Sequence, residues 1–244
     1  MPLDRLGPWL AGLRLRVLRP WDGDPVPPRA TEVGGGLLVL GGVMSALDDH
    51  LAPWLPATKQ LVRDVVESGV PMLGVCLGHQ LLAEATGGEV TVAAPAGREA
   101  GVVEITWCPE AADDPVLAGA VRAAGARAGN GSSGTATAWM PSMHADAVTR
   151  LPPGAVHLAG SAQYPVQAMR LGTALGVQFH PEASPELLAG WARAEGLDAE
   201  EVAARARARD ADVAAVGRAI ATGFAAQVRG PRLVPGRERL HAQP

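Results

Sequence analysis

The sequence predicts a single α/β domain built on a mostly parallel sheet that is flanked by helices. Two apolar runs, LLVL at 37–40 and VPMLGV at 70–75, have the length and composition of buried strands. A helical segment, 57–68, lies between them, and a second helix follows the later run. Strands that alternate with helices form parallel sheets covered on both faces, with ligands beyond the carboxyl ends of the strands.

Three further segments extend this prediction. Polar and apolar residues alternate at 13–18, LRLRVL, which predicts another strand of the sheet. Short valine-rich segments within 89–107 and 155–179 predict a second group of strands, which either pairs antiparallel or extends the main sheet. The Gly-, Ser- and Thr-rich segment 125–138 predicts a flexible loop, because it offers little to bury.

The C-terminal part is predicted to be a helical extension, 193–230, packed on a domain of residues 1–192 and followed by a loose tail, 231–244. Asp198, with Glu201 three residues later, forms a capping-box pattern at the start of a long helix. Apolar residues then recur at steps of three or four, which predicts a face that packs on the core or against another subunit. They are Val213, Val216, Ile220, Phe224 and Val228.

Composition excludes several classes of function. The net charge of -4 leaves no basic surface of the kind that binds nucleic acid or an anionic membrane. No stretch has the length of a membrane span or the pattern of a secretory signal. Lys59 is the only lysine, so a Walker-type phosphate loop cannot form. Cys76 and Cys108 form neither a metal-ligand pair nor a disulfide framework, so we expect a cytoplasmic protein without metal or cofactor.

The segment Gly74-Val75-Cys76-Leu77-Gly78 lies where a strand turns into a helix. Glycines on both sides let such a turn close, and the turn exposes its central residue at the sheet edge, as in a nucleophile elbow. The helix N-terminus and a nearby imidazole would stabilise the thiolate of Cys76. A buried structural cysteine is the alternative, so the catalytic interpretation needs a base elsewhere in the chain.

A candidate base follows a later strand, in Phe179-His180-Pro181-Glu182. Glu182 can accept a hydrogen bond from the ring of His180, and such a carboxylate fixes the tautomer and stabilises the imidazolium. By itself a His-x-Glu pair is more typical of an exposed loop. The presence of Cys76 upstream favours the catalytic interpretation.

The glycine pair Gly41-Gly42 ends the first apolar run. Glycine lets the backbone approach a ligand closely and point its N–H groups inward, which suits an oxyanion hole, although an ordinary tight turn is the alternative. The Ser-Gly-Gly-x-Asp-Ser loop of ATP-using synthetases does not match, because Leu40 and Met44 replace its first serine and its aspartate.

Four segments together resemble the class I glutamine amidotransferases in order and spacing: GGVMSALDD, VPMLGVCLGHQLLAEATGG, MHADAVTRLPPGA and GVQFHPE. The resemblance covers residues 13–192 and is strongest to stand-alone proteins similar to the glutaminase domain of GMP synthase. It implies that family's flavodoxin-like fold. It also implies that Cys76 attacks the side-chain amide of glutamine to form a γ-glutamyl thioester, that His180 passes a proton to the departing ammonia, and that Glu182 holds His180.

The same resemblance implies how substrate is bound. The backbone N–H groups of Gly42 and Leu77 would form the oxyanion hole. The residues expected to contact the rest of the substrate are Val43, Met44, Gln80, Met143 and His144, the last two through their backbone. The side chain of His144 and that of His79 are expected to support the site from behind. Val43 and Ala145 depart from the family's usual proline and glycine, but neither change removes a reacting group.

Three functions fit these residues. The first is a glutaminase subunit that delivers ammonia to a separate synthetase or acceptor protein, because the synthetase half of GMP synthase is missing. The second is a stand-alone hydrolase of other γ-glutamyl compounds. The third is a catalytically silent regulatory or binding module, against which the set of Cys76, His180 and Glu182 argues.

Overall fold

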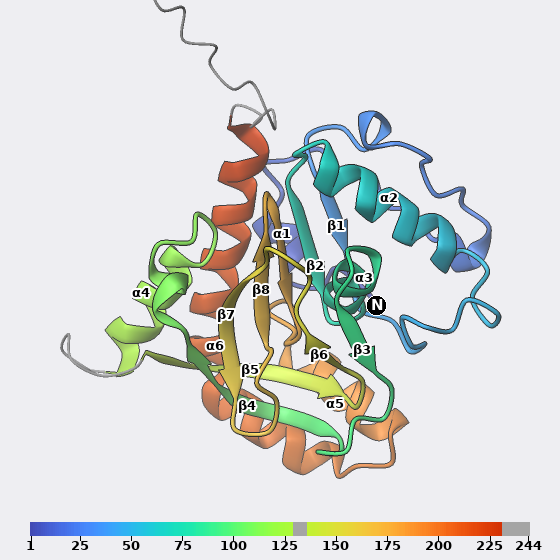
Figure 1. Ribbon diagram of the computed structural model, residues 1–244. Coiled ribbons are helices and arrows are strands. Elements are labelled where there is room, and N and C mark those ends of the chain that lie inside the picture. Colours follow the sequence, from blue (N-terminus) through green and yellow to red (C-terminus); the bar gives the residue numbers. More distant parts are fainter. Residues whose placement is uncertain (129–135, 231–244) are drawn as a thin grey trace, which may run out of the picture.

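The structure is a computed structural model that describes residues 1–128 and 136–230. At its centre is a seven-stranded sheet of order β1-β2-β9-β8-β7-β4-β5 (Figure 1). Its strands are β1 (Leu37–Val39), β2 (Met72–Val75), β4 (Glu99–Trp107), β5 (Thr137–His144), β7 (Val156–Ser161), β8 (Ala168–Leu171) and β9 (Ala174–Val177). A separate two-stranded sheet pairs β3 (Glu89–Thr91) with β6 (Ala147–Arg150).

The central sheet changes character at β9. Strands β1, β2 and β9 run parallel, and Gly74 of β2 lies beside both Val39 and Gly176. From β9 to β5 every pairing is antiparallel. The predicted α/β class is confirmed, and the second group of strands both pairs antiparallel and extends the main sheet. The carboxyl ends of the three parallel strands therefore meet at one edge, where ligands are expected.

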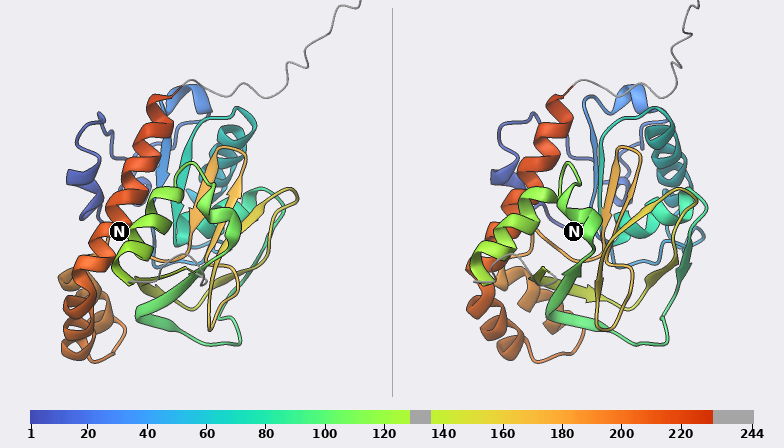
Figure 2. Two further views of the ribbon diagram at one scale, coloured as in Figure 1. Left: turned by 90° about the vertical axis from the view of Figure 1, so that its left-hand side faces the viewer. Right: turned by 60° about the vertical axis from the view of Figure 1, so that its left-hand side comes forward.

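Helices cover both faces of the sheet (Figure 2). On one face lie α2 (Leu55–Glu67) and α3 (Leu77–Ala85), and on the other lie α1 (Leu6–Trp9), α4 (Ala118–Ala128) and α6 (Ala199–Arg229). The helix α5 (Pro185–Ala194) packs against α6. Three 3₁₀ turns complete the description: Pro20–Asp22, Ala30–Glu32 and Pro109–Ala112. Within the described residues, no helix combines the length and apolarity needed to span a bilayer.

The long helix α6 is part of the main core. The side chain of Asp198 accepts hydrogen bonds from the N–H groups of Glu200 and Glu201, which satisfies donors that have no partner within the helix. Along its inner face, Val216, Ile220 and Phe224 are buried in the same cluster as the strands. Val213 is buried as well, and Val228 is partly buried against that cluster. The predicted apolar face therefore packs on the core.

Two predictions from the sequence need correction. Residues 13–18 form no strand: Leu13 packs against the core, but Leu15 and Val17 on the same alternating face are 40% and 51% exposed. The predicted loop 125–138 is wrong at both ends, since α4 continues to Ala128 and β5 begins at Thr137. Residues 129–135 and the predicted tail 231–244 lie outside the described part of the chain.

Candidate functional site

Cys76 connects β2 to α3 at the carboxyl edge of the parallel strands. Its φ of +52° and ψ of -105° form a backbone conformation that residues other than glycine rarely adopt. The N–H of Cys76 donates to the carbonyl oxygen of Val177 at 2.8 Å, which fixes the turn to β9. Cys76 is 5% exposed, so it lies just beneath the surface.

Close packing of backbone accounts for the glycines that flank this turn. A Cβ atom on Gly74 would lie 2.4 Å from the carbonyl oxygen of Gly78. One on Gly78 would lie 2.1 Å from the carbonyl oxygen of Val39. Neither position can hold a side chain, and α3 consequently begins in direct contact with the backbone of β1.

His180 and Glu182 follow β9, the strand beside β2. Nδ1 of His180 lies 2.8 Å from Oε1 of Glu182, and both side chains are fully buried. The N–H of His180 donates to the carbonyl oxygen of Pro141 at 2.8 Å, which holds the backbone in place. Trp191 of α5 packs on the imidazole with the two ring centroids 4.5 Å apart. The imidazole is thus held both by a hydrogen bond and by an aromatic neighbour.

The loop after β1 brings these groups together. A Cβ atom on Gly41 would lie 2.9 Å from Cε1 of His180 and 3.5 Å from Cβ of Cys76, so both residues border the same point. A Cβ atom on Gly42 would lie 2.6 Å from a side-chain carbon of Leu77. The N–H of Leu77 is at the start of α3, where helix amides have no intrahelical acceptor.

The electrostatics favour a protonated ring in His180. Burial alone would lower its pKa, but the charges of Glu182 and of Cys76 as a thiolate outweigh that effect and raise the pKa to about 10. Nε2 of His180 has no hydrogen-bond partner among the described residues. An imidazolium beside a cysteine can stabilise a thiolate and supply a proton to a leaving group.

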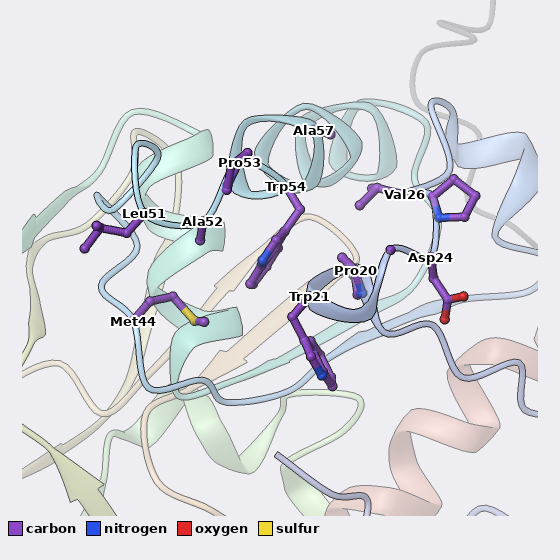
Figure 3. Close-up of a pocket in the computed structure, with 12 residues that line it drawn as sticks. Pro20, Trp21, Asp24, Val26, Met44, Leu51, Ala52, Pro53, Trp54 and Ala57 are labelled. Carbon is purple, nitrogen blue, oxygen red and sulfur yellow. The ribbon is translucent and has the colours of Figure 1, made fainter.

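Met44 continues the glycine loop into an open pocket. It packs with Leu77 and Trp54, whereas the preceding Val43 is 92% exposed. The pocket has a volume of about 640 Å³, and the rings of Trp21 and Trp54 border it (Figure 3). Most of its other lining residues are apolar, among them Pro20, Pro25, Val26, Leu51 and Pro53. An apolar space therefore adjoins the loop that carries Gly42.

Gln80 lies one turn along α3 from Cys76 and is 3% exposed. Its Nε2 donates to the carbonyl oxygen of Asp146 at 3.0 Å and to Oε1 of Gln178 at 3.2 Å. Gln178 is two residues before His180. The amide of Gln80 is therefore held between two segments that border the site.

His144 ends β5, and its imidazole is held inside the protein. Nε2 lies 3.1 Å from Oε2 of Glu99, and Nδ1 lies 2.9 Å from the carbonyl oxygen of Asp146. This supports the expected structural role of the side chain. The neighbouring Met143 pairs with Ala100 of β4.

His79 is fully buried against Gly176, where a Cβ atom would lie 2.5 Å from Nδ1 of the ring. Burial, together with the positive charge of His144, lowers the pKa of His79 to about 3. The ring is neutral and fills the space left by the glycine of β9. His79 thus supports the site through packing.

Sequence reasoning missed Glu99, Gln178 and Trp191. One signal for Glu99 was available. It lies an even number of residues from Ile105 and Trp107 on β4, so its side chain points to the same buried face of the strand. A carboxylate on the buried face of a strand needs partners. No local pattern links Gln178 or Trp191 to the site, because both contacts arise from tertiary packing. Among residues 1–128 and 136–230, no group of three His, Cys, Asp or Glu could hold a metal ion.

Comparisons with known proteins give the same family. Residues 21–189 match the family model for glutamine amidotransferase class-I. A glutamine-hydrolyzing GMP synthase from Thermomicrobium roseum is 36% identical over 149 residues, which are 61% of this chain and 23% of that protein. One subunit of the glutamine-hydrolyzing GMP synthase from Methanosarcina mazei is 40% identical over 162 residues, which are 66% of this chain and 70% of that protein.

The fold agrees with these matches. The crystal structure of a glutamine amido transferase from Methylobacillus flagellatus superposes with a TM-score of 0.78 at 27% identity, covering 98% of this chain and 94% of that one. This chain spans about a quarter of the length of the longer GMP synthases that it matches. With a family model that covers most of its length, the chain belongs to the class I glutamine amidotransferases.

Proposed function

We propose that this chain hydrolyses the side-chain amide of glutamine, with Cys76 as nucleophile, His180 as general acid and base, and Glu182 as the carboxylate that orients His180. The supporting observation is the fully buried His180–Glu182 pair next to Cys76, which itself occupies a strained turn at the start of a helix. Strained backbone and a charged, buried imidazole are typical of catalytic sites.

The reaction follows from these positions. The Cys76 thiolate attacks the amide carbon, and the N–H groups of Gly42 and Leu77 bind the oxyanion, each donor contributing about 3 kcal/mol in comparable sites. The C–N bond then breaks, and the imidazolium of His180 gives its proton to the departing ammonia. Water attacks the γ-glutamyl thioester while His180 takes up a proton, which releases glutamate and restores the thiolate.

The ammonia is proposed to pass to a separate synthetase protein. The Methanosarcina relative is named as one subunit of a GMP synthase, and this chain covers 70% of its length. The longer GMP synthases contain far more chain than the part matched here. A separate protein would then carry the ammonia acceptor.

A stand-alone hydrolase of γ-glutamyl amides is the second candidate, and the pocket beside Met44 favours it. Its volume of about 640 Å³ and its border of Trp21 and Trp54 suit an apolar group attached to the amide nitrogen. Glutamine has no such group. The two candidates therefore differ in whether this pocket is filled during catalysis.

The test measures release of ammonia from glutamine and of amine from γ-glutamyl peptides, in the wild type, Cys76→Ala and Cys108→Ala. Cys108 is a matched control, since its sulfur lies 3.6 Å from Nδ1 of His157 in a second cysteine–histidine pair. We expect only Cys76→Ala to abolish release. Equal rates in wild type and Cys76→Ala would refute the proposal. Release from glutamine that requires an added synthetase would favour the role in ammonia delivery, and cleavage of peptides alone would favour the hydrolase.

A further inference from the structure

A closed ring of hydrogen bonds, largely buried, lies beside the candidate site, and one carboxylate belongs to it. The ring passes through Glu99, His144, Asp146, Gln80, Gln178 and Gln167, in that order. It closes where the N–H of Gln178 donates to the carbonyl oxygen of Gln167 at 2.8 Å and Nε2 of Gln167 donates to Glu99 at 2.7 Å. It thereby joins β4, β5, α3 and the segment that leads to His180.

The partners of His144 determine its charge. Nδ1 faces the carbonyl oxygen of Asp146 and Nε2 faces the carboxylate of Glu99, and both oxygens can act as acceptors. Both ring nitrogens must therefore donate, and an imidazole with two N–H groups is a cation. Burial opposes ionisation of Glu99, but hydrogen bonds from His144, Ser161 and Gln167 outweigh it and lower its pKa. The ring thus contains an ion pair.

The ring also fixes the orientation of the Gln80 amide. A carbonyl oxygen can only accept, so the group that faces Asp146 must be Nε2 of Gln80. The same nitrogen gives its second hydrogen to Oε1 of Gln178. Both N–H groups of the Gln80 amide thus form hydrogen bonds within the protein, and its oxygen is the group available to a ligand.

The position of Gln80 suits the amino-acid end of a substrate held by Cys76. Cys76 is the N-cap of α3 and Gln80 lies one turn later, with its N–H donating to the carbonyl oxygen of Cys76 at 3.0 Å; residues one helical turn apart have Cβ atoms about 5–6 Å from one another. In glutamine, four bonds separate the side-chain carbonyl carbon from the α-nitrogen, roughly 5 Å when extended. A fixed amide oxygen at that distance complements a positively charged ammonium group.

We propose that Glu99 is a positioning residue that selects substrates with a free α-ammonium group, acting through His144 and Asp146 on the amide of Gln80. The inference rests on the proposed glutamine hydrolysis and states what that site requires of its substrate. Without the charge of Glu99, the cation of His144 has no counterion and the ring loosens. The amide of Gln80 can then turn and present N–H groups, which repel an ammonium.

The test uses two probes that alkylate Cys76 through a diazoketone, with loss of dinitrogen. One is glutamine with the diazoketone in place of its amide, and the other lacks only the α-amino group. Mass spectrometry gives the rate constant for each. We expect the wild type to prefer the amino-bearing probe by about tenfold or more, the effect of one hydrogen bond to a charged group. Glu99→Gln should bring the preference below about threefold while labelling by the other probe stays nearly constant.

Asp114→Asn is the matched control. Asp114 forms a buried ion pair with Arg170 at 2.7 Å and 2.8 Å, and Arg170 pairs with Leu175 near the amino end of β9, at the opposite end of that strand from His180. This variant loses the same kind of charge but should keep the preference for the amino-bearing probe. It separates a specific effect of Glu99 from general loss of a buried ion pair.

Three outcomes overturn the inference. They are an equal loss of labelling by both probes in Glu99→Gln, a wild type without preference, and an Asp114→Asn variant that loses the preference equally. A wild type labelled by neither probe contradicts the proposed function itself. Should Glu99→Gln prove unfolded by circular dichroism, Gln80→Met replaces it, and retention of the preference in that variant overturns the inference.

Discussion

Glu182→Gln is predicted to remove most of the catalytic activity while leaving the geometry of the site intact. The substituted amide oxygen can still accept the hydrogen bond from Nδ1 of His180, which spans 2.8 Å. Only the negative charge is lost. Because the charge of Glu182 supplies part of what raises the pKa of His180, the ring of the variant should lose its proton at a lower pH.

The magnitude follows from the pKa of His180. A rise from 6.5 to about 10 corresponds to about 5 kcal/mol of stabilisation of the imidazolium, at 1.36 kcal/mol per unit. Glu182 and Cys76 share this effect, and the charge of Glu182 is the largest single cause that raises the pKa. Loss of about half, roughly 2.5 kcal/mol, lowers kcat on the order of 10²-fold.

The assay is ammonia release from glutamine across pH, with Glu186→Gln as an exposed control carboxylate on α5. In the wild type His180 keeps its proton until the pH rises through about 10, so the alkaline fall in activity lies there. In Glu182→Gln it should move down by about two pH units, because about half of the roughly 5 kcal/mol is lost at 1.36 kcal/mol per unit. Because folding raises the pKa of His180, the stability that the wild-type His180–Glu182 pair contributes is fully present below pH 6.5 and is lost as the pH rises from 6.5 to about 10. A kcat within threefold of wild type, or an unmoved alkaline limb, would refute the reasoning.

Three further substitutions test other parts of the structure. Gly78→Ala should lower the free energy of unfolding by about 3 kcal/mol, because its Cβ would lie 2.1 Å from a strand carbonyl, whereas Gly125→Ala, with open space around it, should be neutral or stabilising in a denaturant titration. Trp191→Ala should reduce kcat by roughly two- to tenfold through loss of the ring contact, and Trp191→Phe should retain most of the activity; identical kinetics in both would argue against that contact. Asp198→Ala should cost about 1 kcal/mol in thermal unfolding through loss of the α6 cap, with kcat unchanged.

The parts of the fold that the sequence predicted have strong local signals. Continuous apolar runs identified β1 and β2, and the glycines around Cys76 marked the turn that the structure shows. The strand predicted at 13–18 is wrong because an alternation of polar and apolar residues does not by itself show that other parts of the protein cover the apolar face. A strand needs a hydrogen-bonded neighbouring strand and a buried face. Among the described residues no strand pairs with 13–18, and within that segment only Leu13 and Leu18 are partly buried.

The site was predicted less completely because much of it depends on distant contacts. Glu99 is 45 residues from His144 and 68 from Gln167, so no short motif contains the ring that they share. Trp191 comes 11 residues after His180, and their rings meet only because the chain folds back at α5. Packing decides such contacts, and the domain boundary at residue 192 likewise stays a prediction.

The main hydrophobic cluster has a consequence for how the protein is made. It unites Leu6 and Leu10 with Ile220, Phe224 and Ala225, so its first and last members are separated by most of the polypeptide. During synthesis the early leucines leave the ribosome long before the helix that covers them. The interior therefore closes only after α6 has been synthesised, and until then these apolar side chains depend on chaperones or on transient neighbours to avoid aggregation.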